Sequence, residues 1–158
     1  MLNPALPARQ VVSGFKKGML MPQESTWRAW YDGLVKPSWT PPGSTIGIIW
    51  LILYPMIAIS FIYVMVNAFK GKLSWAIGVV FIVNLIANLL FSPIFFGMKN
   101  ISLATLDILI VWVTIVLQFF LIWPISKIIA VLQIPYFLWV TTASTIQLTV
   151  FIKNVLMK

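Results

Sequence analysis

The sequence predicts an all-α integral membrane protein, a bundle of transmembrane helices, because its composition is strongly apolar and its long apolar runs carry almost no charge. Of the 158 residues, 61% are hydrophobic and 9% are charged, and the mean hydropathy is +1.00. Soluble globular domains are only about half apolar, and a quarter of their residues are charged. The length leaves room for about four or five spans and for no separate soluble module.

The N-terminal segment, residues 1–29, is predicted to differ from the rest of the chain. Its apolar stretch is interrupted by Lys16, Lys17 and Gly18, so it cannot cross a bilayer as a helix. We expect this segment to be disordered or interfacial, and it has no apolar core long enough for a secretory signal. Residues 30–158 are predicted to form the transmembrane domain.

Residues 30–42 are predicted to form a stiff, extended loop directly before the first span. Pro37, Pro41 and Pro42 fix their own φ angles and remove three backbone donors. The stretch also carries three aromatic side chains at the mouth of a membrane helix. Two interpretations remain open: a lid over an apolar pocket, or an interfacial aromatic belt.

Four spans follow this loop, and each is long enough to cross a bilayer. They are predicted at residues 46–69, 73–98, 102–123 and 128–152. Asp107 is the only charged residue inside them. Pro135 falls within the last span, so we expect it to kink that helix or to delay its start.

The eleven Lys and Arg residues are scattered between the spans rather than gathered on one face, which indicates topology and not nucleic-acid binding. One side of the membrane receives Arg9, Lys16, Lys17, Arg28, Lys36, Lys99, Lys153 and Lys158. The other side receives only Lys70, Lys72 and Lys127. The positive-inside rule then places the proline-rich loop and the C-terminus in the cytoplasm.

The chain contains no cysteine and no histidine. This composition excludes disulfides, thiolate nucleophiles, the usual zinc sites and haem ligated by His or Cys. No metal site is predicted.

Each span presents polar or aromatic residues at helical spacing on one face. These stripes are Trp50, Tyr54 and Ala58; Asn84, Asn88 and Ser92; Asp107, Thr114 and Gln118; and Trp139, Ala143 and Gln147. Because unpaired polar groups are costly in hydrocarbon, we expect a polar-dotted interior that faces one apolar cavity. The alternative is that the amides only hydrogen-bond between helices. Asp107 is either a lid anchor paired with Arg28 or Lys36, or a snorkelling residue at a helix end.

Several motifs occur together in a characteristic order. They are Trp30-Tyr31-x-x-Leu34-x-Lys36-Pro37-x-Trp39-x-Pro41-Pro42, Ile49-Trp50-x-x-Leu53-Tyr54, Asn88-x-x-Phe91-Ser92-Pro93-x-Phe95-Phe96, Ala104-x-x-Asp107 and Pro135-Tyr136-x-x-Trp139-Val140. With these motifs the chain resembles the TspO/MBR family, which comprises bacterial tryptophan-rich sensory proteins and mitochondrial translocator proteins. The resemblance runs from about Trp30 to Gln147.

The resemblance implies a bundle of five transmembrane helices, usually dimeric, with one cavity closed by the loop between the first two helices. It also implies binding of porphyrins such as protoporphyrin IX and of benzodiazepine-site ligands. The implied ligand-binding residues are Tyr31, Trp39, Trp50, Tyr54, Asn88, Phe91, Ser92, Asp107, Trp139 and Ala143. Some bacterial members degrade protoporphyrin in light, and Trp50 and Trp139 stand at the positions implicated in that reaction.

The main hypothesis is therefore a porphyrin-binding membrane protein that senses or sequesters its ligand, with no cofactor beyond the porphyrin itself. We expect a homodimer in a bacterial plasma membrane, whose ligand is a porphyrin or another flat apolar molecule. The alternatives are an enzyme of light-dependent porphyrin degradation and, less well supported, a small-molecule transporter. Residues 1–29 do not supply the family's first helix, so the chain has either four spans or an atypical N-terminus.

Overall fold

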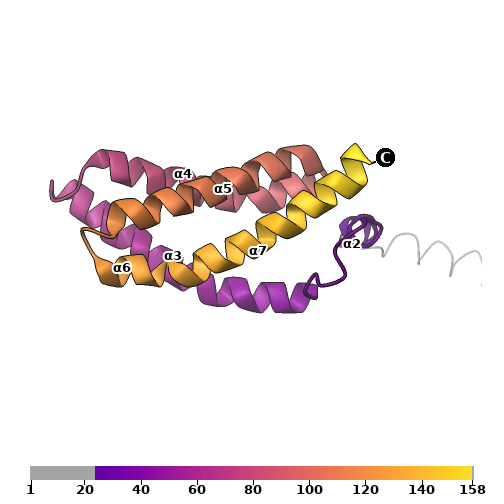
Figure 1. The fold of residues 1–158 in the computed structure, drawn as a ribbon, viewed down its shortest axis with the longest axis horizontal. Helices are drawn as coiled ribbons and strands as arrows, with labels where there is room; N and C mark the ends of the chain where they lie inside the picture. Colours follow the sequence, from indigo (N-terminus) through magenta and orange to yellow (C-terminus); the bar gives the residue numbers. More distant parts are fainter. Residues whose placement is uncertain (1–23, 158) are drawn as a thin grey trace, which may run out of the picture. The chain divides into compact units, whose positions relative to one another are not determined.

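The structure, a computed structural model, describes residues 24–157, in which all regular elements are helical (Figure 1). These elements are α2 (Glu24–Asp32), α3 (Gly43–Phe69), α4 (Trp75–Ser92), η1 (Pro93–Gly97), α5 (Ile101–Ile122), α6 (Lys127–Leu132), α7 (Ile134–Phe151) and η2 (Ile152–Leu156). Helix α2 belongs to a separate unit that ends at Leu34, so it is described by itself. Of the predicted segment 1–29, residues 1–23 lie outside the described residues.

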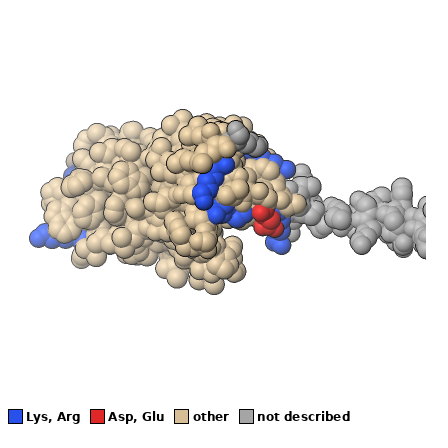
Figure 2. Space-filling view, turned by 45° about the vertical axis from the view of Figure 1, so that its right-hand side comes forward, with Lys and Arg blue, Asp and Glu red and all other residues tan. Residues whose placement is uncertain are grey.

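The prediction of four spans is confirmed for the described part of the chain. Four helical segments are long and apolar enough to cross a membrane: Gly43–Phe69, Trp75–Gly97, Ile101–Ile122 and Lys127–Leu156. They run side by side in the bundle of Figure 1. Figure 2 shows one face of this bundle, where Lys and Arg lie near the ends and leave a broad uncharged surface between them.

The predicted extended loop over residues 30–42 is corrected at its beginning. Trp30, Tyr31 and Asp32 form the last turn of helix α2, and irregular structure extends from residue 33 to residue 42. A proline restricts itself and the residue before it, and the first proline of the stretch is Pro37. The residues farther upstream therefore remain free to be helical. We call residues 35–42 the proline loop.

Proline also shapes the second and the fourth spans. Pro135 lies in the first turn of α7, directly after the short helix α6, so the last span starts at Lys127 and is interrupted near this proline rather than starting late. Pro93 opens η1, a π-helical turn that continues α4. There the amide of Met98 donates to the carbonyl of Pro93 at 2.9 Å. A π-turn of this kind absorbs an irregularity without ending the span.

The turns at the two ends of the bundle are defined by local chemistry. Gly71 has a φ of +68°, which a residue without Cβ adopts at little cost, and it reverses the chain between α3 and α4. Ser74 caps α4 by accepting from the amide of Ala76, and Asn100 caps α5 by accepting from the amide of Leu103. The turn at Gly71 places Lys70 and Lys72 at one end of the bundle, and Asn100 lies in the turn at the other end.

Helix α5 is the most buried of the four spans and α3 the least. Helix α5 packs mainly against α4 and α7. Two groups of buried residues form the core. One consists of Leu53, Ala87, Val111, Ile115, Tyr136 and Val140, and the other of Val64, Phe81, Ile122, Ile129 and Ala130. The first group lies at the level of Trp50 and Trp139, which pack against it from α3 and α7.

Candidate functional site

A continuous chain of hydrogen bonds connects α4, α5 and α7 inside the bundle. Asn88 Nδ2 donates to the Tyr136 hydroxyl at 3.0 Å, and that hydroxyl donates to Asn84 Oδ1 at 3.1 Å. Asn84 Nδ2 then donates to Thr114 Oγ1 at 2.8 Å, and Thr114 Oγ1 donates to the carbonyl of Ile110 at 2.7 Å. Because all donors point the same way, each bond polarises the next. The chain fixes the rotamers of two amides and one phenol in the core.

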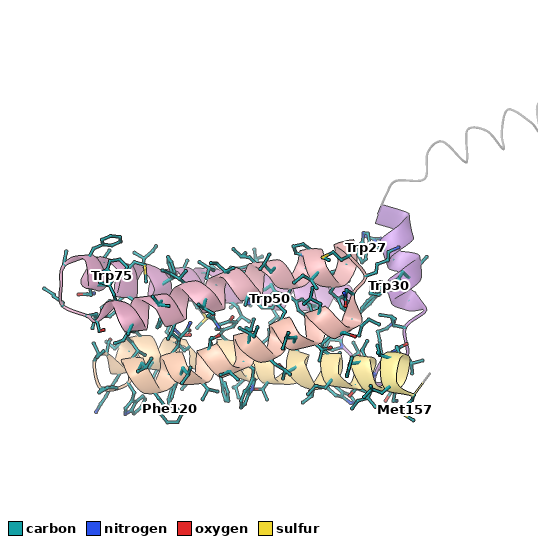
Figure 3. The ribbon with its side chains drawn as sticks, turned by 90° about the horizontal axis from the view of Figure 1, so that it is seen from above. Trp27, Trp30, Trp50, Trp75, Phe120 and Met157 are labelled. Carbon is teal, nitrogen blue, oxygen red and sulfur yellow. The ribbon has the colours of Figure 1, made fainter. Side chains whose placement is uncertain are left out.

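Aromatic side chains extend this network toward α3. The ring of Trp50 stacks on that of Tyr54, with centroids 5.2 Å apart, and meets the ring of Tyr136 edge-on at 6.3 Å. Figure 3 shows Trp50 within the bundle, whereas Phe120 lies at its outer edge. An indole in this setting offers a flat apolar face beside hydrogen-bonding groups.

Four buried polar atoms have no hydrogen-bond partner among the described residues. They are Asn88 Oδ1, Asp107 Oδ2, Trp139 Nε1 and Ser144 Oγ. Asn88, Asp107 and Ser144 are each at most 8% exposed. Buried polar groups are nearly always paired, and an unpaired one costs about 1–3 kcal/mol. Such atoms mark the positions at which a ligand or a bound water would complete the structure.

Ser144 and Asp107 lie at the same level of the bundle. The register of α5 and α7 is fixed by hydrogen bonds from Gln147 Nε2 to Thr105 Oγ1 at 3.1 Å and from Trp112 Nε1 to Thr141 Oγ1 at 3.0 Å. Ser144 falls midway between the two partners on α7, and Asp107 falls between the two partners on α5. The two unpaired oxygens are therefore contributed by neighbouring helices at one depth.

Asn88 lies at this level as well. The register of α4 and α5 is fixed by hydrogen bonds from Asn84 Nδ2 to the carbonyl of Val111 at 3.0 Å and from Gln118 Nε2 to the carbonyl of Val80 at 3.5 Å. One further helical turn along the two antiparallel helices brings Asn88 opposite the stretch of α5 that contains Asp107. Three helices thus contribute unpaired polar atoms to one level of the interior.

The structure corrects one interpretation of Asp107. This residue is 6% exposed, so it is not a snorkelling residue at the membrane surface. Its Oδ2 has no partner among residues 24–157, so this oxygen is not held by Lys36. Asp107 is instead a buried carboxyl group within the polar level described above.

The predicted stripes differ in how well they match the buried faces. The α5 stripe of Asp107, Thr114 and Gln118 is buried throughout. On α4 the two asparagines are buried, but Ser92 is exposed. On α3 the expectation was wrong for Ala58, which is exposed; the buried face of that helix is Leu53, Ser60, Val64 and Ala68. Helix α3 is the least buried of the four spans, so its interior face is the least well defined.

The remaining predicted ligand-binding residues are placed as follows. Trp39 in the proline loop is 54% exposed and Tyr54 is 44% exposed. Phe91 is partly buried and stacks on Phe95 with ring centroids 5.6 Å apart. Ala143 is partly buried on α7. Tyr31 lies in α2, and burial raises the pKa of its hydroxyl, with Asp32 adding to that rise.

Sequence reasoning did not assign a site role to Tyr136 or Ser144. Tyr136 lies at the centre of the hydrogen-bond chain. The one feature of the sequence that could have indicated its role is its position directly after Pro135, in the first turn of α7. Ser144 offered no such signal, because serine is common at packed positions of membrane helices. Its unpaired hydroxyl is evident only in three dimensions.

Comparison with known proteins agrees with these features. The model of the TspO/MBR family matches residues 7–152. The chain is 44% identical over 128 residues to the tryptophan-rich protein TspO of Bacillus cereus, covering 80% of this chain and 82% of that protein. It is 32% identical over 127 residues to the protein CrtK of Rhodobacter capsulatus, covering 80% and 79% of the two chains.

A eukaryotic relative is found at lower identity. The human translocator protein is 29% identical over 127 residues, which cover 79% of this chain and 75% of that protein. The match of the family model spans most of the sequence and includes the first three described membrane segments and most of the fourth. The chain is therefore a membrane protein that belongs to the TspO/MBR family.

Proposed function

We propose that this protein binds porphyrins such as protoporphyrin IX, and ligands of the benzodiazepine-site type, inside the helix bundle for sensing or sequestration. The observation that carries the proposal is the set of unpaired buried polar atoms on α4, α5 and α7 next to the aromatic faces of α3 and α7. A flat, largely apolar ligand with a few hydrogen-bonding groups complements such an interior.

The individual side chains suit this ligand class. Trp50 and Trp139 offer indole faces on which a tetrapyrrole can stack. The unpaired N–H of Trp139 can donate to a carbonyl or carboxylate of the ligand, and the unpaired Oδ1 of Asn88 can accept from an N–H group. Because Asn88 Nδ2 is already bonded to Tyr136, the amide is held with this oxygen available.

A titration of the detergent-solubilised protein with protoporphyrin IX, followed by tryptophan quenching, tests the proposal. We expect saturable quenching, and an increase in Kd of about tenfold for Trp139→Phe and for Asn88→Ala, as the loss of one buried hydrogen bond would cause. Trp75→Phe is the matched control, because Trp75 is 47% exposed and packs against Phe69 at the opposite end of α4. Non-saturable quenching that is unaffected by the first two variants would refute the proposal.

The second candidate function is light-dependent oxidative degradation of the bound porphyrin. Trp50 favours it, because its oxidisable indole lies in the interior stacked on Tyr54. Oxygen would be the oxidant, and the chain has no histidine or cysteine to serve as the base or nucleophile of a hydrolytic reaction. Illumination of the titrated complex separates the two functions. Loss of several porphyrins per chain would indicate catalysis, and one-to-one photodamage would indicate binding alone.

We further propose that the protein is a homodimer of a bacterial plasma membrane with its proline loop and C-terminus in the cytoplasm. Lys36, Lys99 and Lys153 lie at the loop end of the bundle, which supports this orientation. The large apolar area left exposed on α3 is available for lipid or for a second copy of the chain.

A further inference from the structure

The first residue of the proline loop is bound by the side chain of Asn154, a residue 119 positions away in the sequence. The amide N–H of Val35 donates to Asn154 Oδ1 at 2.9 Å, and Asn154 Nδ2 donates to the carbonyl of Val35 at 2.9 Å. The side-chain amide thereby takes the place of a peptide group and exchanges two hydrogen bonds, as paired residues of antiparallel strands do. The contact does not depend on which side chain residue 35 carries.

Asn154 is itself held in position for this contact. Its Nδ2 also donates to the carbonyl of Val150 at 2.8 Å, one helical turn earlier. An amide has two N–H donors and one carbonyl oxygen, so both donors and the oxygen of Asn154 are used. Asn154 lies in η2, the π-helical turn at the end of α7. Single π-turns occur frequently at functional positions of helices.

The rest of the loop is internally ordered. Both the amide and the hydroxyl of Thr40 donate to the carbonyl of Pro37, at 3.1 and 2.7 Å. Pro37 is buried, and Pro41 and Pro42 limit the backbone between Thr40 and the start of α3. Because of these restraints, we expect the segment to move as a unit about its ends rather than by unravelling. The Val35 end is therefore a point at which movement of the loop can be controlled.

We propose that the pairing of Asn154 with Val35 is a latch that keeps the proline loop closed over the loop end of the bundle and sets the rates of ligand exchange. This inference rests on the proposed binding function. Both hydrogen bonds are exposed to water, which competes for them, so the latch can open and close repeatedly. Asn154 is thus a positioning residue, acting on the ligand through the loop.

If Asn154 acts as a latch, its loss changes the rates of binding and release together. A residue that touches the ligand would instead change Kd. If the loop opens more often, ligand enters and leaves faster, while the contacts of the bound state are unchanged. For Asn154→Ala we expect association and dissociation rates that both rise about tenfold, equivalent to about 1.4 kcal/mol. We expect Kd to change by less than about threefold.

The rates can be measured by stopped-flow tryptophan quenching with protoporphyrin IX on the full chain. Asn154→Asp is a second variant of nearly unchanged size, in which an acceptor oxygen replaces the NH2 group and both donors are lost. Asn67→Ala is the matched control, because Asn67 Nδ2 makes the same bond to a carbonyl one turn earlier, that of Tyr63, at 2.8 Å at the opposite end of the bundle. Rates of the Asn154 variants that equal those of Asn67→Ala and wild type would overturn the latch.

Amide hydrogen exchange at Val35 tests the latch independently of ligand. We expect this amide to be protected in wild type and in Asn67→Ala, and to exchange faster in both Asn154 variants. Equal exchange in wild type and the Asn154 variants would overturn the latch. If wild type shows no saturable binding of protoporphyrin IX, the proposed function fails, and the exchange of the Val35 amide still decides whether Asn154 holds this end of the loop.

Discussion

Single residues in the interior of this bundle fall into two groups. Asn84, Tyr136 and Thr114 use their polar atoms on one another, so they join three helices without a ligand. Asp107 and Ser144 lie beside them with an oxygen that has no partner among the described residues. Since the chain satisfies the first group so completely, the second is not explained by a shortage of partners. Under the function proposed above, it is the part of the interior that would contact a bound molecule.

The Tyr136 hydroxyl is expected to contribute measurably to stability. In Tyr136→Phe, Asn84 Oδ1 loses its donor and Asn88 Nδ2 loses its acceptor. We expect the free energy of unfolding to fall by about 1 kcal/mol, since interhelical hydrogen bonds in membrane proteins contribute modestly. Reversible unfolding in mixed micelles with increasing SDS would measure the change. Tyr63→Phe, outside this hydrogen-bond chain, is the control, and equal stabilities of the two variants would contradict the prediction.

The candidate site was predictable from the sequence only where several polar residues share one helix face. Asp107, Thr114 and Gln118 repeat at helical spacing, and all three are buried. Ser144 is one of several small residues in a row and belongs to none of the predicted stripes. Asn154 lies near the C-terminus, past the last residue of the predicted stripe on that helix. Their roles depend on registers between helices and on a contact with the proline loop. A single sequence carries no information about such pairings.

Elements were predictable to the extent that local chemistry determines them. The spans follow from uncharged length, and the start of α7 follows from Pro135. Helix α2 was missed because the prolines were taken to govern residues upstream of them, which they do not. The π-turns η1 and η2 have no distinctive composition and were not foreseen. Their form reflects packing at helix ends rather than propensity.

The turn between α3 and α4 is expected to depend on the backbone of Gly71 alone. Its φ is +68°, and a Cβ built there meets no atom within 4 Å. Gly71→Ala should therefore lower the free energy of unfolding by about 1 kcal/mol through backbone strain, without a steric clash. Gly97→Ala is the matched control, because its Cβ also meets no atom within 4 Å and its φ is not left-handed. The same SDS titration measures both, and equal effects would contradict this account.

In the bundle as a whole, charge varies along the helix axes, whereas burial varies from one helix to the next. Lysines lie at the two ends, and burial varies across the bundle, from the central α5 to the exposed α3. The hydrogen bonds that define the interior connect α4, α5 and α7, so these three helices form a framework on which α3 is held mainly by apolar and aromatic contacts. The proline loop directly precedes α3, the helix that is least held by interhelical hydrogen bonds. Ligand exchange through movement of this loop would therefore disturb the three-helix framework least.

The orientation of the bundle in the membrane is the last prediction, and it follows from the charges at its ends. Because the chain contains no cysteine, a single cysteine can be introduced at each end for labelling. Ser38 in the proline loop and Lys72 in the opposite turn are both exposed. By the positive-inside rule, Ser38→Cys should react with a membrane-impermeant maleimide only in inside-out vesicles, and Lys72→Cys only in right-side-out vesicles. The reverse pattern would show that the loop faces outward, and labelling of both variants from both sides would show that the few charges fail to select one orientation.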